Sequence, residues 1–264
     1  MESSDHTKIS GAPCAYETFM ASATARRRRR MLRVVNVSKY FGKVRALESV
    51  TVEVDRGELV GLIGPNGSGK TTLINVITGY YEPDGGAVYL GDRKLSGMRP
   101  HEIASLGVAR TFQVPRVFRS MTVLQNLMAA LAYNREARRG AEERAEWLLG
   151  ALGLSEKRND LASNLSGGQQ RLLEIARALI VNPKVLLLDE PTAGLNPAVI
   201  ESLRELLEQV KRSGTAILMV EHNMRVVSSF CDRVVAMNEG IVVAEGKPEE
   251  VLLNEAVIEA YLGR

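Results

Sequence analysis

The sequence predicts an α/β fold that combines a mainly parallel sheet core, an antiparallel β part and an inserted helical subdomain. Three observations predict it. From residue 185 onward, apolar segments of strand length alternate with helical periodicity, which is typical of parallel strands covered by helices on both faces. An apolar segment at residues 58–63 runs into a glycine-rich turn and then a helical pattern. Residues from about 114 to 164 have helical periodicity and would form the inserted subdomain.

Composition and charge limit the possible functions. With 45% hydrophobic and 25% charged residues, the 264-residue chain can bury a core and is one large domain or a domain with a subdomain. Its apolar runs, such as residues 185–188, are far shorter than the roughly 20 residues of a membrane-spanning helix, so we expect no membrane crossing. Residues 1–30 contain six basic and three acidic residues, which accounts for the net charge of +3. The remaining chain is neutral, which argues against nucleic acid as a ligand.

The first thirty residues differ from the rest of the chain. They lack apolar periodicity and end in five arginines, Arg26 to Arg30. We expect residues 1–30 to be a disordered extension whose removal is harmless, and Met31 to begin the folded domain of residues 31–264. The alternative is a basic arm that contacts anionic lipid headgroups. The two cysteines, Cys14 and Cys231, show no metal or disulfide spacing, which is typical of a reducing compartment.

Periodicity and turn residues define the elements of the first two thirds of the chain. Apolar alternation identifies the strands, and a Gly85-Gly86 pair marks the turn into one of them. Asn182-Pro183 closes the last of the helices. The expected order is strand 34–37, strand 50–54, strand 58–63, helix 69–78, strand 87–90, helix 122–133, helix 141–152 and helix 166–182.

The last third alternates more regularly. A turn at Asn238-Glu239-Gly240 predicts a hairpin between two apolar strands. The expected order is strand 185–189, helix 197–212, strand 216–220, helix 224–230, strand 233–237, strand 241–244 and two short terminal helices.

The glycine-rich turn fits the phosphate-binding loop G-x-x-x-x-G-K-[ST] at every fixed position. Its glycines let successive backbone N–H groups point inward at a phosphate, and the following helix N-terminus favours the same anion. Lys70 would reach the β- and γ-phosphates, and Thr71 would ligate Mg²⁺. The predicted nucleotide-binding residues here are Gly64, Pro65, Asn66, Gly67, Ser68, Gly69, Lys70, Thr71 and Thr72.

The apolar strand 185–189 ends in two acids that suit hydrolysis. Asp189 at its tip can hold the water shell of Mg²⁺. Glu190 lies just beyond the strand, where it could take a proton from the attacking water. An apolar strand that ends in acids is often only core, and the phosphate loop upstream favours the catalytic interpretation.

A second helix N-terminus suited to an anion lies at residues 165–170. Ser166 is the expected N-cap, and Gly167 and Gly168 expose the backbone N–H groups before Gln169. Together with the phosphate loop and the Asp189 strand, this segment closely resembles the signature motif of ABC ATPases. The resemblance covers residues 31–264 and implies the P-loop NTPase fold of the ABC type, with ATP and Mg²⁺ as cofactors.

The resemblance also assigns roles to single residues. Gln113 matches the glutamine that senses Mg²⁺ and the γ-phosphate, and His222 matches the switch histidine that contacts the γ-phosphate. Phe41 matches the aromatic residue that stacks on adenine, with Tyr40 as the alternative. One departure is Asn196, since many members carry aspartate at this position; the amide keeps the hydrogen-bonding shape and loses the charge.

The resemblance further implies an assembly. In the family, the signature of one subunit closes on the nucleotide of another, so we expect a homodimer or a heterodimer with a paralogous ATPase subunit. The segments 110–113, 117–127, 193–197 and 261–263 look like those of branched-chain amino acid importers. The resemblance therefore implies transmembrane permease subunits as partners and, through them, an indirect link to a solute-binding protein. It also implies that the chain lies peripherally on the cytoplasmic face of the inner membrane. Related importers of other small polar solutes share much of this pattern.

Two other classes are alternatives. A chromosome-maintenance or repair ATPase needs a long coiled-coil insertion between phosphate loop and signature, and Lys70 and Ser166 are too close in sequence for one. A small-molecule kinase with the same loop would have no use for residues 165–170 or for His222.

Overall fold

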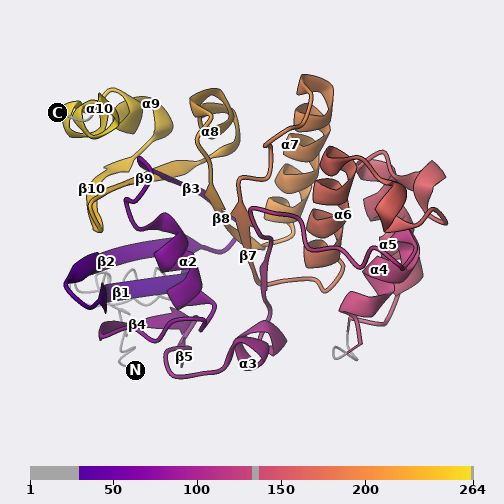
Figure 1. Cartoon of the computed structure of the whole chain (residues 1–264), viewed down its shortest axis with the longest axis horizontal. Coiled ribbons are helices and arrows are strands. Elements are labelled where there is room, and N and C mark those ends of the chain that lie inside the picture. The colour runs from indigo at the N-terminus through magenta and orange to yellow at the C-terminus, as the bar shows by residue number, and fades with distance from the viewer. Residues whose placement is uncertain (1–29, 133–136, 263–264) are drawn as a thin grey trace, which may run out of the picture.

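The computed structural model describes residues 30–132 and 137–262. They form two β-sheets with helices packed beside them and a further group of helices to one side (Figure 1). The expectations for residues 1–29, Tyr133 and Gly263 lie outside these residues. Arg30, assigned above to the extension, is the first residue of strand β1. Within the described ranges, no helix is long and apolar enough to cross a membrane.

The smaller sheet is antiparallel, as the fold class requires. Its strands lie in the order β2-β1-β4-β5. They are β1 Arg30–Phe41, β2 Val44–Asp55, β4 Gly85–Leu90 and β5 Arg93–Lys94. In β1 and β2, buried apolar residues such as Val50, Val52 and Val54 alternate with exposed or half-buried residues, so one face of this sheet packs on the core.

The larger sheet is parallel except at one edge, where β10 runs antiparallel to β9. Its order is β10-β9-β3-β8-β7-β6. Its strands are β3 Leu59–Ile63, β6 Val108–Arg110, β7 Val185–Asp189, β8 Ala216–Val220, β9 Arg233–Asn238 and β10 Ile241–Gly246. Every residue of β3, β7 and β8 is buried, which confirms a sheet covered on both faces.

Most predicted helices are confirmed within one to three residues. The helices are α2 Lys70–Ile77, α3 Pro100–Ser105, α4 Val123–Ala130, α5 Ala141–Ala151, α6 Gly167–Leu179, α7 Pro197–Arg212, α8 Met224–Phe230, α9 Pro248–Leu252 and α10 Glu255–Leu262, with 3₁₀ turns η1 Ser155–Lys157 and η2 Ala162–Asn164. The short elements β5, β6 and α3 were not predicted. Residues 114–121, within the region expected to be helical, form a loop.

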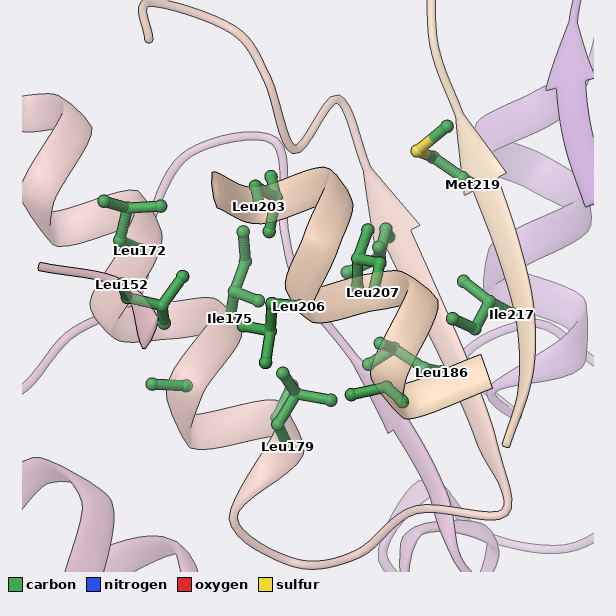
Figure 2. Close-up of a cluster of buried hydrophobic side chains, with 14 of the residues drawn as sticks. Leu152, Leu172, Ile175, Leu179, Leu186, Leu203, Leu206, Leu207, Ile217 and Met219 are labelled. Carbon is green, nitrogen blue, oxygen red and sulfur yellow. The ribbon is translucent and has the colours of Figure 1, made fainter. Parts of the chain in front are cut away.

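Alternate residues of the parallel strands pack on opposite faces of the sheet. Leu186 and Leu188 of β7 join the core on one face, and Val185 and Leu187 join the core on the other. The first core extends into the helical region: Figure 2 shows leucine and isoleucine side chains of α6 facing those of α7, which in turn cover β7 and β8. The helix that carries the predicted signature therefore packs beside α7, and it also contacts β6 and β7 of the sheet directly.

Candidate functional site

The site lies where three neighbouring parallel strands end. β3, β8 and β7 are adjacent in that order, and both Leu62 and Asp189 lie opposite Val220. Since parallel strands point the same way, the segments that follow them meet at one edge of the sheet. The phosphate loop follows β3, Glu190 follows β7 and His222 follows β8. Segments far apart in the sequence are thus brought together.

Glycine is required at both ends of the phosphate loop. A Cβ on Gly64 would lie 2.1 Å from the carbonyl oxygen of Met237, and one on Gly69 would lie 2.6 Å from that of Ala46. The φ angles there are 147° and 103°, which L side chains rarely adopt. α2 begins at Lys70 without a side-chain cap, so its first turn offers backbone N–H groups to an anion.

Lys70 is buried beneath this loop. Its ammonium donates to the carbonyl oxygens of Gly64 at 2.7 Å and Pro65 at 2.8 Å, and to the Ser68 hydroxyl at 3.3 Å. Burial lowers the pKa of Lys70, while the carboxylates of Glu190 and Asp189 act in the opposite direction. Gly64 and Ser68 are buried as well, whereas Asn66, Gly67 and Thr71 are exposed and Thr72 is half-buried. A buried cation behind a curled, accessible backbone can bind a phosphate.

One carboxylate oxygen connects the three predicted catalytic residues. Glu190 Oε1 accepts a hydrogen bond from Gln113 Nε2 at 3.2 Å, and His222 Nε2 lies 3.1 Å from the same oxygen. Glu190 has a φ of 47°, in the left-handed region that is unfavourable for a glutamate, and its N–H donates to the Val220 carbonyl oxygen. This backbone turn directs the side chain beyond the strand end. The predicted base is therefore held by the two residues expected to respond to the γ-phosphate.

A buried glutamate next to His222 supports this arrangement. Glu221 accepts hydrogen bonds from the N–H and hydroxyl of Thr192 at 3.1 and 2.6 Å, and its second oxygen accepts from the N–H of His222. The loop after β7 and the loop after β8 are thereby fixed to each other.

Asp189 is a buried carboxylate at the end of β7. Burial is the main influence and raises the pKa of Asp189, although the guanidinium of Arg110, 3.8 Å away, acts to lower it. Asp189, the hydroxyl of Thr71 and the amide of Gln113 supply only oxygen donors, which Mg²⁺ prefers. The described residues contain no cluster of three acidic, histidine or cysteine side chains that could hold a metal alone. One or two protein oxygens plus substrate phosphates are the usual Mg²⁺ site, so these residues fit that metal.

The predicted signature segment is a capped helix start at the surface. The Ser166 hydroxyl accepts a hydrogen bond from the N–H of Gln169, and the Gln169 side chain accepts one from the N–H of Ser166. Ser166 and Gly167 are exposed, and a Cβ on Gly168 would lie 3.1 Å from Leu195. These residues line an open hollow of about 940 Å³ together with residues 193–196 and part of the 114–119 loop.

Two residues of α6 join the signature to the hydrolysis site, and neither was predicted. Arg171 donates to the carbonyl oxygens of Glu190 at 2.9 Å and Gln113 at 2.8 Å. Glu174 is buried and accepts hydrogen bonds from the N–H groups of Phe112 at 3.3 Å and Arg116 at 3.0 Å. Glu174 could have been noticed in the sequence because it is an acidic residue among the apolar positions of a predicted helix. No sequence pattern could reveal its backbone partners.

The aromatic candidates for adenine lie at the end of β1. The Phe41 ring is 42% exposed, meets Tyr81 edge to face at 5.1 Å between centroids, and has the Lys39 ammonium 5.6 Å from its own centroid. The Tyr40 hydroxyl is instead hydrogen-bonded to Glu48. Both residues are exposed to a similar degree, so only the ring contacts with Tyr81 and Lys39 set Phe41 apart from Tyr40.

Asn196 has a local structural role, whatever part it plays in communication between the two expected nucleotide sites. Its side chain accepts a hydrogen bond from the Val199 N–H at 3.0 Å and so caps α7.

Two family models match the chain. The "ABC transporter" model matches residues 47–193, and the "Branched-chain amino acid ATP-binding cassette transporter" model matches residues 242–264. Among curated relatives, the high-affinity branched-chain amino acid transport ATP-binding protein LivG of Salmonella typhimurium is 43% identical over 88% of this chain and 98% of its own length. The probable LivG of Archaeoglobus fulgidus is 40% identical over 89% of this chain and 96% of its own.

Solved structures agree with this similarity. The ADP conformation of MJ1267, an ATP-binding cassette of an ABC transporter, has a TM-score of 0.79 at 36% identity and covers 89% of this chain and 99% of its own. The dimeric post-hydrolysis state of the cassette MJ0796, bound to ADP and Pi, has a TM-score of 0.74 at 31% identity and covers 83% and 99%.

Proposed function

This chain belongs to the ABC transporter family of ATPases, and from that premise we propose that it powers the import of branched-chain amino acids through separate membrane subunits. The observation that carries the proposal is the 43% identity to LivG over almost the whole length of that relative. The C-terminal match to the branched-chain amino acid cassette model supports the same substrate class. Importers of other small polar solutes are the alternative outcome of the test below.

We propose the following roles for the site residues. The loop Gly64–Thr71 and Thr72 bind the phosphates, with Lys70 turning its ammonium from the loop carbonyls to the β- and γ-oxygens. When bound, Mg²⁺ would neutralise charge on those oxygens, and Thr71, Asp189 and Gln113 would hold it. Because Asp189 is buried and faces Arg110, its position is fixed before any ligand arrives.

Glu190 is the proposed general base. Water must lie between its carboxylate and the γ-phosphate for attack. Proton transfer from the water to Glu190 would accompany formation of the new P–O bond, while the bond between the γ-phosphorus and the bridging oxygen breaks and ADP leaves with that oxygen. His222 and Gln113 both contact Glu190 Oε1, so a γ-phosphate that draws either of them away would change the environment of the base. Phe41 would stack on adenine, with Tyr40 as the second candidate.

The assembly we propose is a dimer in which Ser166, Gly167, Gly168 and Gln169 close on the nucleotide of the other subunit. Ser166 and Gly167 are exposed in a single chain, and Gly168 and Gln169 are half-buried. The exposed start of this helix supports the arrangement, because N–H groups that could bind an anion face outward. The other subunit is a second copy or a paralogous ATPase. Permease subunits would hold the dimer at the cytoplasmic face of the inner membrane and receive solute from a binding protein.

Reconstitution tests the function. The chain is co-expressed with candidate permease subunits, and the purified complex is reconstituted in vesicles together with the candidate solute-binding protein. ATP-dependent uptake of labelled leucine is then measured. Urea and a short amide serve as competing solutes, and Glu190→Gln serves as the inactive control. Uptake of leucine that requires ATP and is lost in the variant supports the proposal. A complex that hydrolyses ATP and transports only urea or amides contradicts the solute assignment, and a chain that co-purifies with no membrane protein contradicts transport itself.

A further inference from the structure

The last helix of the chain reaches the phosphate loop. The hydroxyl of Tyr261 on α10 accepts a hydrogen bond from the backbone N–H of Gly64 at 2.8 Å, although the two residues are 197 positions apart. α10 contacts β9 and β10, and Figure 1 shows it beside α9 next to this edge of the parallel sheet. β9 is paired with β3, so α10 packs on the neighbour of the strand that leads into the loop.

The Gly64 peptide is held from both sides. Its N–H donates to Tyr261, and its carbonyl oxygen accepts from the buried ammonium of Lys70 at 2.7 Å. A Cβ there would overlap the Met237 carbonyl, so the backbone has little freedom to move toward β9. Gly64 is the first residue after β3, and its orientation sets the direction in which the chain enters the loop. Any group that fixes this peptide also fixes the loop N–H groups.

The role of the Tyr261 hydroxyl can be tested without disturbing the packing of the ring. The residue is 38% exposed, so a phenylalanine can occupy the same position without leaving a cavity. Burial raises the pKa of Tyr261, so its hydroxyl stays protonated and neutral at physiological pH. Removal of the Tyr261 oxygen alone would leave the Gly64 N–H without its hydrogen-bond acceptor.

We propose that Tyr261 is a positioning residue for ATP binding, which locks the entry of the phosphate loop without touching the nucleotide. The inference rests on the proposed function of the loop. Because the loop binds phosphate in both the ground state and the transition state, a change in its orientation weakens both equally. The expected consequence is a higher KM for ATP with kcat preserved.

The test compares Tyr261→Phe with Leu262→Ala, a matched change of an exposed neighbour on the same helix. For each full-length chain, hydrogen exchange of the peptide that covers residues 59–67 is measured without nucleotide. Binding of a fluorescent ATP analogue and the ATP dependence of hydrolysis are then measured. In Tyr261→Phe we expect faster exchange and an increase of about 3- to 10-fold in both Kd and KM, the usual weight of one hydrogen bond, with kcat unchanged. Leu262→Ala should match wild type in all of these measurements.

The outcomes separate the inference from the function on which it rests. Wild-type exchange and ATP affinity in Tyr261→Phe would overturn the role of Tyr261, and so would a loss confined to kcat. A wild-type chain that binds no ATP would contradict the proposed function instead. In that case the exchange of residues 59–67 alone would decide the inference: faster exchange in Tyr261→Phe supports the lock, and unchanged exchange removes it.

Discussion

The phosphate loop and the signature segment are similar in sequence and opposite in setting. Both place glycines at a helix N-terminus. In the first, Lys70 and Ser68 are buried, and neighbouring carbonyl groups leave no room for a side chain at Gly64 or Gly69. In the second, Ser166 and Gly167 are exposed, and a Cβ on Gly167 would have no described atom within 4 Å. One segment is enclosed by its own chain, and the other is presented outward.

This difference explains why we propose two chains for one reaction. In the proposed function, the enclosed loop would bind phosphate, Asp189 would hold the metal and Glu190 would act as the base, all within a single chain. The exposed signature adds anion-binding N–H groups that face away from the chain's interior, and Arg171 behind it contacts the backbone of Glu190 and Gln113. A second subunit that occupies the signature would therefore be sensed at the hydrolysis site.

The largest expected effect is on the enclosed side of the comparison. Glu190→Gln should retain ATP binding and slow hydrolysis by about 10²- to 10⁴-fold, because the amide keeps an oxygen for hydrogen bonding and cannot accept the proton. The variant should accumulate as an ATP-bound dimer on size-exclusion chromatography. Glu201→Gln, on the exposed face of α7, is the control. Turnover near the wild-type rate in Glu190→Gln would remove Glu190 from the mechanism.

On the exposed side, Gly168→Glu should abolish turnover and leave the ATP affinity of the monomer nearly intact. The new side chain would have to displace Leu195, 3.1 Å from the Cβ position, and would place a negative charge where a phosphate is expected. Gly150→Glu, at an exposed position of α5, is the control for the charge change. If the monomer lost its ATP affinity, Gly168 would serve the nucleotide of its own chain.

A mixture of two inactive variants sharpens this test. Lys70→Ala lacks a working phosphate loop but retains its signature, and Gly168→Glu has the reverse defect. If the signature acts across an interface, a mixed dimer contains one site with both parts intact, and mixing should restore part of the ATPase activity. If both parts act within one chain, the mixture stays inactive.

The sequence predicted the elements that carry the phosphate loop and the signature segment better than the hydrogen bonds that connect them. Strands β7 and β8 and helices α7 and α8 have the predicted bounds because continuous apolar runs and strong caps define them. β6 was missed, since its three residues are too few to show periodicity and its strand character depends on pairing with β7. The candidate site residues were predicted from motifs. Arg171, Glu174 and Tyr261 contact backbone groups distant in sequence, and such contacts carry no side-chain pattern.

Glu174 offers a smaller and pH-dependent test of the link between the two regions. Glu174→Gln replaces one acceptor by an amide N–H₂ that faces a backbone N–H, so the free energy of unfolding should fall by about 1–3 kcal/mol at neutral pH. Glu205→Gln, exposed on α7, should have little effect. Urea denaturation measures both, and an unchanged stability in Glu174→Gln would contradict the role of Glu174 as the anchor of the Gln113 loop.

The sign of the pH dependence follows from burial. Burial raises the pKa of Glu174 above its ordinary value of 4.5, so the folded chain holds this proton where the unfolded chain has lost it. The advantage of wild type over Glu174→Gln should therefore be largest below pH 4.5 and should decrease as the pH rises toward the folded pKa. A wild-type advantage that grew with pH over this window would mean that the two backbone N–H groups outweigh burial.

The smallest expected effect concerns Asn196, which lies in the loop that touches Gly168. Since its side chain caps α7, Asn196→Ala should lower the free energy of unfolding by about 1 kcal/mol. Asn196→Asp keeps the cap and adds a negative charge at a helix N-terminus, which should stabilise the chain slightly at neutral pH and lose that gain as the carboxylate is protonated. Thermal unfolding at two pH values and the ATP dependence of hydrolysis are the measurements. We expect both variants to turn over ATP at close to the wild-type rate, because the cap serves the fold. A change in the cooperativity of ATP hydrolysis in Asn196→Asp, with stability unaltered, would instead assign this position to communication between the two sites.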